Sequence, residues 1–415
     1  MEKTLRTRSS EILLTLVLSF YVIWQMPIVA LYTNTYMAMI VLVLLFVTIF
    51  LKGDTILVHT PKIMIAGLCG MLLTLFNRMI LRDNLLNTVW AAFLELLPMG
   101  LGVMLIRKRM GAQLKVLVPV ILLAYAVTLV TTYIGLQEYP MASRELATSS
   151  VDYAKYYAKN IGGFHFIYAI VVLHPMIICL LRMKNKKLLC AAYSVLIGTC
   201  IIASQYTMAT LGFIISCGAY LFPTDKSRSA VGVRMFLLVV AATVALIMAP
   251  VILELLAEQE VLEASADKLK DAARVLRGQE VDNYGTRNRQ WAYEYSWKQF
   301  LAAPLFGSMF TSARDSGGHS YVLDNMSRWG MVGLSVIVYI FIQVQRFYKE
   351  LTGQTTVFYF AMFSMVMAIV FCIMNPHSWP YELGFVIPVI IYYILGDQNG
   401  DDEEISEVKE KREES

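Results

Sequence analysis

The sequence predicts an all-α, polytopic membrane protein: a bundle of about twelve transmembrane helices with one large helical extracytoplasmic loop. Hydrophobic residues make up 57% of the 415 residues and charged residues 16%. A soluble domain is closer to half apolar and a quarter charged. Apolar runs of roughly 20 residues, the length that crosses a bilayer, recur along the chain. The net charge of +4 does not indicate a nucleic-acid partner.

The first apolar run follows Lys3, Arg6 and Arg8, as it would in a signal peptide. The run is long, however, and no small-residue cleavage site follows it, so we interpret it as an uncleaved first span. The expected spans, in chain order, are Glu11–Leu31, Tyr36–Leu51, Ile63–Leu81, Leu85–Ile106, Leu114–Leu136, Ile161–Leu181, Leu188–Ser204, Thr207–Phe222, Val231–Leu253, Tyr321–Gln345, Thr356–Met374 and Tyr381–Leu395.

The distribution of Lys and Arg predicts the orientation of these spans. More than half of the 35 basic residues fall in segments on the same side as the N-terminus when the spans are counted in order. By the positive-inside rule, both termini are therefore cytoplasmic and the polar segment 254–320 lies outside. We expect residues 1–396 to form one membrane domain that includes this segment. Residues 397–415 are acidic and nearly free of apolar residues, which predicts a disordered cytoplasmic tail.

Two helices are expected in the segment 254–320. Over Leu255–Leu276, apolar residues recur at helical spacing with charged residues between them, which predicts an amphipathic helix lying over the bundle. A second helix is expected to start near Thr286, a suitable N-cap, and to end before Pro304. Gly307 then allows an unusual backbone turn.

The second of these helices carries a candidate catalytic residue, Arg287, and several candidate substrate-binding residues. At 3.6 residues per turn, its first stripe contains Arg287, Trp291, Glu294 and Lys298. Guanidinium groups match phosphate oxygens with a bidentate fork, so Arg287 and Arg289 are candidates for clamping a diphosphate. The same pattern fits an ion pair between Arg287 and Glu294, and an interfacial belt of aromatic residues that includes Trp291.

A histidine lies at the foot of the next expected span. His319 precedes Asp324 and Arg328, which fall within the first turns of that span. Charged residues in a span usually face the bundle interior or a wet cavity, so we expect these three side chains to line a cavity open to the outside. His319 titrates near neutral pH and is a candidate general base. The alternative is a structural histidine that caps the helix or is ordered by Asp324.

Other isolated charges are further candidates. Arg144, in the expected outer loop 137–159, and Arg82, at the outer end of the third span, are candidate phosphate ligands; a solvated arginine and a snorkelling one are the alternatives. Glu95 lies near the middle of the fourth span, which predicts a functional carboxylate or one paired with a polar group such as Asn77. The 6 cysteines form no Cys-x-x-Cys pair, so we expect neither a metal site nor a structural disulfide.

Residues 285–334 resemble a family pattern. The motifs are Gly-Thr-Arg-Asn-Arg-Gln-Trp, then Pro-Leu-Phe-Gly at residues 304–307, Gly-His-Ser-Tyr at 318–321 and Trp-Gly-x-x-Gly-Leu at 329–334. Together they are similar to the O-antigen ligase and Wzy-type polymerase family, polytopic membrane glycosyltransferases of the GT-C type. The matching positions are Arg287, Trp291, Pro304, Gly307 and His319.

The match lacks one family residue. The family often has an arginine at the outer start of a span two before the large loop, and no arginine occurs at residues 204–210. If a second phosphate-binding cation is needed, Arg144, Arg82, Arg289 or Arg314 would supply it.

The resemblance implies glycosyl transfer without a metal or cofactor, on the outer face of the bacterial cytoplasmic membrane. An undecaprenyl-diphosphate-linked oligosaccharide in the membrane would be the donor and a hydroxyl of a second glycan the acceptor. Arginines would stabilise the departing lipid diphosphate, and His319 would orient or deprotonate the acceptor. We expect a polymerase of lipid-linked repeat units that builds a cell-surface polysaccharide. A ligase that moves glycan to another acceptor is one alternative. A lipid-linked oligosaccharide transporter, suited by the many spans and by Glu95, is another.

Overall fold

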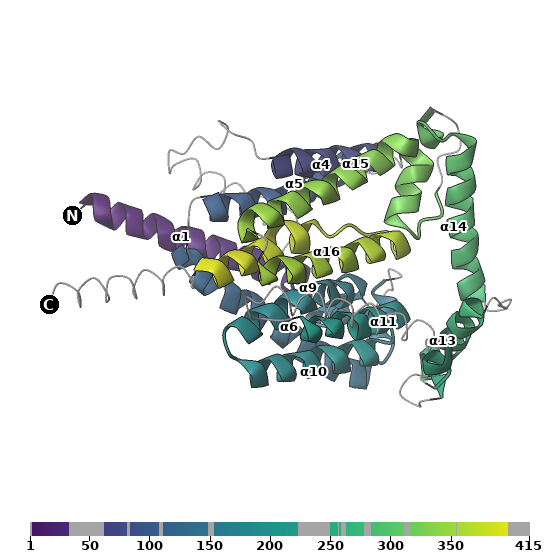
Figure 1. The fold of residues 1–415 in the computed structure, drawn as a ribbon, viewed down its shortest axis with the longest axis horizontal. Coiled ribbons are helices and arrows are strands. Elements are labelled where there is room, and N and C mark those ends of the chain that lie inside the picture. Colours follow the sequence, from purple (N-terminus) through teal and green to yellow (C-terminus); the bar gives the residue numbers. More distant parts are fainter. Residues whose placement is uncertain are drawn as a thin grey trace.

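A computed structural model describes most of the chain, and it is helical throughout the part described. The described residues are 2–32, 62–80, 84–107, 111–147, 153–222, 250–255, 257–258, 263–277, 284–310, 316–353 and 355–396, and no strand occurs among them. The helices form an elongated bundle with two further helices across one end (Figure 1). The predicted all-α class is confirmed.

Within the described residues, seven helices are long and apolar enough to cross a membrane. Each corresponds to an expected span within a few residues at its start. They are α4 (Lys62–Ile80), α5 (Leu85–Arg107), α6 (Gly111–Glu138), α9 (Phe164–Met183), α10 (Lys187–Ser204), α15 (Tyr321–Thr352) and α16 (Thr356–Met374).

Shorter apolar helices occupy three more expected positions. They are the apolar part Ile12–Trp24 of α1 (Glu2–Trp24), α11 (Thr207–Ser216) with the 3-10 turn η1 (Cys217–Leu221), and the helical residues 380–396, which include the π-helical segment η4 (Glu382–Val386). The expected span Tyr36–Leu51 lies outside the described residues, as does all of Val231–Leu253 before residue 250. The acidic tail 397–415 also lies outside them.

The first expected span is broken in two. α1 ends at Trp24, and the short helix α2 (Pro27–Tyr32) begins after a two-residue gap. Proline lacks the N–H needed inside a helix but is well suited to the first helical position, so Pro27 ends one helix and opens the next. The prediction of a continuous helix from Glu11 to Leu31 was therefore wrong.

α9 forms the centre of the bundle. Every residue from Phe166 to Leu181 is buried, and α10, α11 and α16 pack around it. A helix that is apolar all round is expected in such a place. The histidine in this buried stretch, His174, is satisfied, since its two ring nitrogens lie 2.7 Å from Ser216 Oγ and 2.9 Å from Ser194 Oγ.

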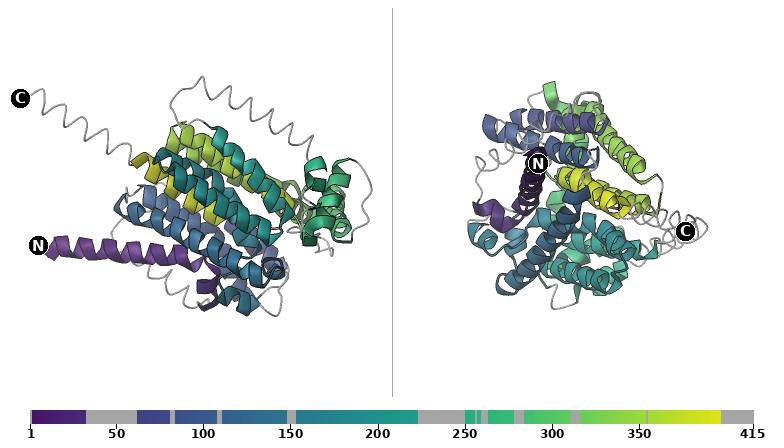
Figure 2. Two further views of the ribbon diagram at one scale, coloured as in Figure 1. Left: turned by 90° about the horizontal axis from the view of Figure 1, so that it is seen from below. Right: turned by 90° about the vertical axis from the view of Figure 1, so that its left-hand side faces the viewer.

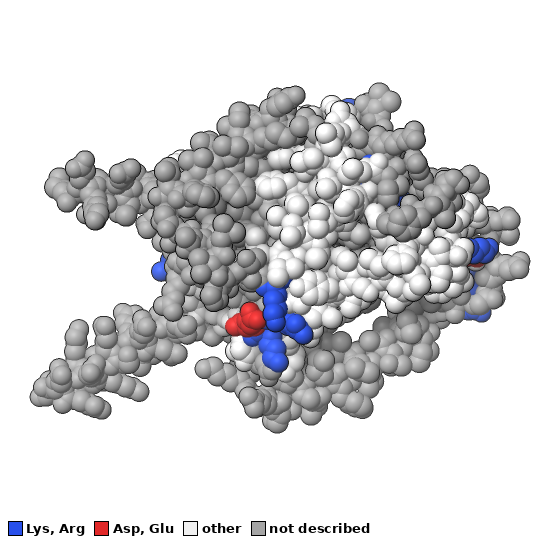
Figure 3. Space-filling model, turned by 90° about the horizontal axis from the view of Figure 1, so that it is seen from above, with Lys and Arg blue, Asp and Glu red and all other residues white. Residues whose placement is uncertain are grey.

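The outside of the bundle is apolar as well. Large hydrophobic side chains are exposed on α6, where Leu123 is 66% and Ile134 62% accessible. In the face seen in Figure 3, most of the described surface is uncharged; one group of Lys and Arg side chains, with acidic atoms beside it, lies in the lower middle of the view. Such a surface suits contact with lipid.

Two helices lie across one end of the bundle: α13 (Glu263–Leu276) and α14 (Tyr284–Ala302) (Figures 1 and 2). α1 begins, and residues 380–396 end, at the opposite end of the bundle. Both helices were expected. The predicted N-cap was wrong, because α14 begins at Tyr284, two residues before Thr286. The helix stops at Ala302, ahead of Pro304, as predicted.

The turn after α14, at residues 304–307, packs directly against the kink of α15 at Gly330. Gly307 has φ +62°, and a Cβ on it would lie 2.4 Å from the carbonyl carbon of Arg328. Gly330 has φ +61°, and a Cβ on it would lie 2.5 Å from the carbonyl carbon of Leu305. The amide of Met331 donates to the Pro304 carbonyl at 2.8 Å. The two main chains therefore touch through two glycines that no other residue type fits.

Candidate functional site

The loop that carries His319 is organised by a buried carboxylate. Asp324 is 5% exposed and accepts three hydrogen bonds: from Ser296 Oγ at 2.8 Å, and from the amides of Gly318 and Ser320 at 3.2 Å each. Ser296, on α14, also accepts from the Gly317 amide at 2.8 Å. Asp324 thus ties the His319 loop to α14, and its oxygens are already engaged, which makes it a positioning residue.

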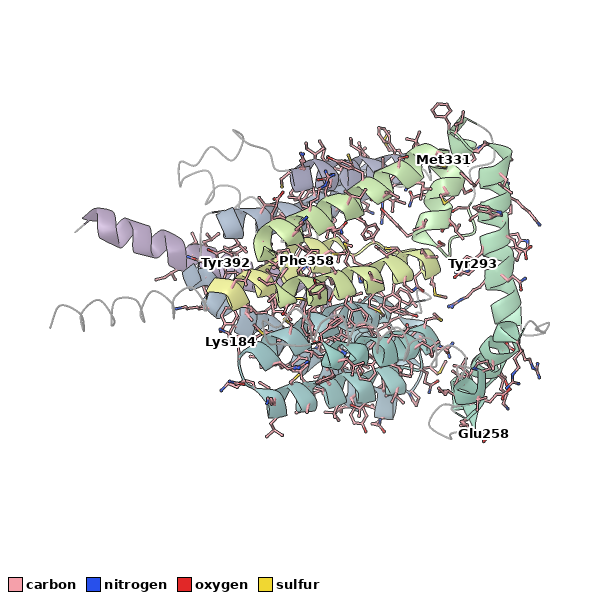
Figure 4. All side chains as sticks on the ribbon, viewed as in Figure 1. Lys184, Glu258, Tyr293, Met331, Phe358 and Tyr392 are labelled. Atoms are coloured by element: carbon pink, nitrogen blue, oxygen red, sulfur yellow. The ribbon has the colours of Figure 1, made fainter. Side chains whose placement is uncertain are left out.

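The head of α15 is capped within the same loop. Ser320 is the N-cap, and its hydroxyl accepts from the Leu323 amide at 3.1 Å. The hydroxyl of Tyr293 donates across from α14 to the Met374 carbonyl at 3.0 Å, at the end of α16. Tyr293 lies on α14 where that helix faces the bundle (Figure 4). α14, α15 and α16 are therefore joined by polar contacts around His319.

Two arginines from distant segments converge beside this loop. Arg144 lies on the short helix α7 (Ala142–Glu145), and Arg289 lies on α14. Burial lowers the pKa of the Arg144 guanidinium, and the positive charge of Arg289 lowers it further, while Tyr206 raises it. An arginine stays protonated despite such a shift. Two fixed positive charges therefore lie near enough to repel one another, an arrangement that an anion would relieve.

α7 is held in place by its neighbours. The Ser143 hydroxyl donates to the Gly162 carbonyl, and the Ser143 carbonyl accepts from the Tyr206 hydroxyl at 2.5 Å. The Tyr206 ring in turn packs against Phe164 and Tyr168 of α9, with centroids 5.6 and 5.7 Å apart. Tyr168 and Tyr206 are both close enough to Arg144 and Arg289 to feel their charges. We call Arg144, Arg289, Tyr168 and Tyr206 the cationic cluster.

His319 is electrostatically linked to this cluster. Burial lowers the pKa of His319 below its ordinary value of 6.5, the charge of Arg289 lowers it further, and Asp324 raises it. The imidazole is therefore neutral at pH 7 and able to accept a proton. Three candidates of the sequence analysis, Arg144, Arg289 and His319, are thus brought together.

The other face of α14 points away from this cluster. Trp291 is 57% exposed and stacks on Tyr295, with ring centroids 5.3 Å apart. Glu294 is exposed, accepts from Gln290 at 3.1 Å and pairs with Lys298 at 3.7 Å. The backbone of Arg287 lies in α14 on the stripe of Trp291 and Glu294, whereas its side chain lies outside the described residues. Arg82 and Arg314 lie outside them altogether.

A cavity lined by both polar and apolar side chains lies inside the bundle, next to the His319 loop. Its volume is about 660 Å³, and its wall runs from Gly318 and Asp324 at the head of α15 to Tyr125 of α6 and Glu382 of η4. Asp324 and Arg328 line the cavity, as predicted. His319 was also expected to line it, but its neighbour Gly318 does so instead. Arg328 also donates through Nη2 to Ser316 Oγ at 2.7 Å.

A partly buried hydrogen-bond network joins α4 to α15, and two of its members, Asn77 and Asn325, line the cavity. Asn77 donates to Asn325 Oδ1 at 2.8 Å and accepts from Trp329 Nε1 at 2.5 Å. Of the two interpretations of Glu95, the one in which it pairs with a polar group fits its contacts, although the partner is not Asn77, the example named above. Glu95 accepts instead from Ser378 Oγ at 2.8 Å, because residues 375–379 turn in between α16 and the last helix.

The sequence reasoning missed three titratable residues of the cavity: His165, His377 and Glu382. The two imidazole rings lie 5.1 Å apart, and His165 meets the Trp379 ring edge-on at 5.2 Å. A signal existed for two of them. Pro376 and Pro380 flank His377 and mark a helix break, and Glu382 is a carboxylate near the start of an apolar run.

Among the described residues, no group of three or more His, Cys, Asp and Glu side chains is placed to hold a metal ion. No protein-family model matches this chain, and no curated protein matches it.

Proposed function

We propose that this chain is a membrane glycosyltransferase whose donor is an undecaprenyl-diphosphate-linked oligosaccharide, and that it polymerises such repeat units on the outer face of the bacterial cytoplasmic membrane. The supporting observation is the convergence of Arg144 and Arg289 beside a neutral His319 at one end of an apolar helix bundle. Guanidinium groups bind phosphate oxygens with a bidentate fork, so two adjacent ones suit a diphosphate. The residues 285–334 that resemble the O-antigen ligase and Wzy-type polymerase family lead to the same reaction.

The chemistry assigns a role to each group. The acceptor hydroxyl attacks the anomeric carbon of the donor and gives its proton to His319. The bond between that carbon and the diphosphate oxygen breaks, and the electron pair leaves with the lipid diphosphate. Arg144 and Arg289 stabilise the charge that develops on the leaving group, and their fixed positions avoid the cost of reorganisation. Asp324 holds the His319 loop in register.

A polymerase and a ligase would share this site, because they differ in the acceptor alone. We favour the polymerase. A second function is suggested by the cavity inside the bundle, since carboxyl groups within membrane-spanning helices, such as Glu95, often mark transport pathways. A lipid-linked oligosaccharide transporter would use the cavity without releasing lipid diphosphate.

One experiment separates these functions. Purified protein is reconstituted with a defined undecaprenyl-diphosphate oligosaccharide, and both longer saccharides and free lipid diphosphate are measured. We expect both products, and a loss of about 100-fold in rate for Arg289→Gln and for His319→Ala. The control is Arg274→Gln, since Arg274 is exposed on α13. Movement of intact substrate across the membrane with no lipid diphosphate released would instead support the transporter.

A further inference from the structure

The cavity inside the bundle contains a carboxyl group with an unused acceptor. Glu382 is 3% exposed, and its Oε2 has no hydrogen-bond partner within the described part of the chain. The hydroxyl of Tyr381, also on the cavity wall, has none there either. Burying a polar group without a partner costs free energy, so such groups in a cavity indicate that something else bonds to them. η4 itself is π-helical, a conformation that occurs frequently at functional sites.

A second carboxyl group lies on a different part of the same wall. Glu95 interacts with Ser378, Thr74 and Arg78. The charge of Glu382 acts on the side chains of Tyr21 and Tyr125 instead. To bind a single metal ion, Glu95 and Glu382 would both have to reach the same point, and their different neighbours argue against this. Two acceptors on separate stretches of wall suit a ligand with several donors spread over its length.

The size and chemistry of the cavity define that ligand further. A volume of about 660 Å³ lies within the range of small-molecule sites. The wall offers carboxylates, amides, imidazoles, hydroxyls and the guanidinium groups of Arg78 and Arg328, which together accept from and donate to hydroxyl groups. A neutral, polyhydroxylated molecule satisfies all of these, and the cavity has room for about two sugar units.

The cavity adjoins the cationic cluster. Phe164 and His165 are consecutive on α9. Phe164 packs on Tyr206 of the cluster, while His165 lines the cavity. Gly318, the neighbour of His319, also lies on the cavity wall. A saccharide in the cavity would therefore lie next to both the candidate base and the diphosphate clamp.

We propose that this cavity is a saccharide-binding site in which Glu382 and Glu95 accept hydrogen bonds from sugar hydroxyls, an inference that rests on the proposed function for the identity of the ligand. Glu382 is the residue whose replacement tests this proposal best, since its Oε2 has no hydrogen-bond partner within the described part of the chain. Glu382 also lowers the stability of the saccharide-free protein, because its carboxyl group is buried and one of its oxygens then lacks a hydrogen bond.

The test uses the full-length protein in detergent on an array of immobilised free oligosaccharides, followed by titration with the soluble saccharides that the array selects. Pyrophosphate is titrated separately as the probe of the cationic cluster. We expect Glu382→Leu to weaken saccharide binding at least tenfold, since it removes the carboxyl group that would bond to the sugar hydroxyls. Pyrophosphate binding should be unchanged, and the melting temperature without saccharide should rise. Glu138→Gln, at the exposed end of α6, is the matched control and should change none of the three.

A second variant guards against an indirect effect. Ala169 is 3% exposed on the cavity wall, and Ala169→Phe should block saccharide binding by filling the space. The proposal is overturned if wild-type protein selects no oligosaccharide, or if Glu382→Leu and Ala169→Phe both bind them normally. A failure of the proposed function has another signature: wild-type protein would not bind pyrophosphate, or Arg144→Gln and Arg289→Gln would not weaken that binding.

Discussion

The hydroxyl of Ser296 donates a hydrogen bond to Asp324 Oδ1 at 2.8 Å and so joins α14 to the head of α15. The same oxygen accepts from Gly318, and the other oxygen accepts from Ser320. The loop between those amides carries His319. The position of the candidate base is thus fixed by a carboxylate that need never touch a substrate.

Replacing this carboxylate should release the loop. In Asp324→Asn an NH₂ group replaces one of the two carboxylate oxygens. This NH₂ group cannot accept the hydrogen bond that the oxygen accepted, so two donors then face each other. We expect a loss of about 1–3 kcal/mol in unfolding free energy and a larger loss of turnover than of substrate affinity. Thermal unfolding and steady-state kinetics measure the two. The control is Asp267→Asn on the exposed face of α13. Equal stability and turnover in Asp324→Asn would contradict this role.

The pH dependence of the reaction should follow His319. Because burial and Arg289 hold its pKa below 6.5, activity should be level at neutral pH and fall as the pH decreases through that lower pKa. Arg289→Gln removes a lowering influence, so the acidic limb should move to higher pH. Asp324→Asn removes a raising influence and should move it to lower pH. Profiles of kcat/KM measure all three, and Lys298→Gln is the control. Shifts in the same direction for both variants would exclude His319 as the titrating group.

The two arginines at the start of α14 should differ in importance. Arg289 acts on Arg144 and His319, whereas position 287 shares a stripe with the exposed Trp291. We therefore expect Arg289→Gln to weaken pyrophosphate binding more than Arg287→Gln, by about tenfold for one lost charge-assisted contact. Calorimetric titration of both variants decides between them. The reverse order would support the catalytic role that the family pattern assigns to Arg287.

The kink of α15 should tolerate no side chain. Gly330→Ala should cost at least about 2 kcal/mol, because φ is +61° and the new Cβ meets main-chain atoms at 2.5 Å. Gly353 is the matched control, with φ +56° and nothing within 4 Å of the place where a methyl group would lie. Its change to alanine should cost about 1 kcal/mol, for the backbone alone. Denaturant unfolding in detergent compares the two. Equal losses would mean that the contact between turn and kink adds nothing.

The side-chain amide of Asn77 should stabilise the protein through its hydrogen bonds to Asn325 and Trp329. Asn77→Leu leaves Trp329 Nε1 without an acceptor and Asn325 Oδ1, on a residue 2% exposed, without a donor. We expect a loss of about 1–3 kcal/mol for the unsatisfied pair. Trp329→Phe in that background should cost less than it does in the wild type, because its partner is already gone. Additive losses would show that the two side chains do not interact in solution.

Much of the helical framework was predictable from the sequence, and most of the site was not. Apolar runs predicted α4 to α6, α9, α10, α15 and α16, because lipid-facing and core positions are both hydrophobic. The end of α14 before Pro304 followed from proline chemistry. The break at Pro27 was missed, because the apolar run continues through it.

The site depends on contacts between distant segments. Periodicity tells which face of a helix a residue shares, but not which other helix meets that face. This is why Ser378 could not be named in advance as the partner of Glu95, and why the proximity of Arg144 to Arg289 had no signal of its own. His377 lies in the irregular stretch 375–379 before the last helix, where neither the helical nor the strand period applies, and Glu382 lies just after it in the π-helical segment η4.

The close approach of Gly307 and Gly330 limits how this protein can change over time. A clash between side chains can be relieved by shrinking a neighbour, but the atoms that a methyl group would strike here belong to the backbone itself. Selection for revertants of Gly330→Ala should therefore return the glycine codon and yield no second-site suppressor at the contact.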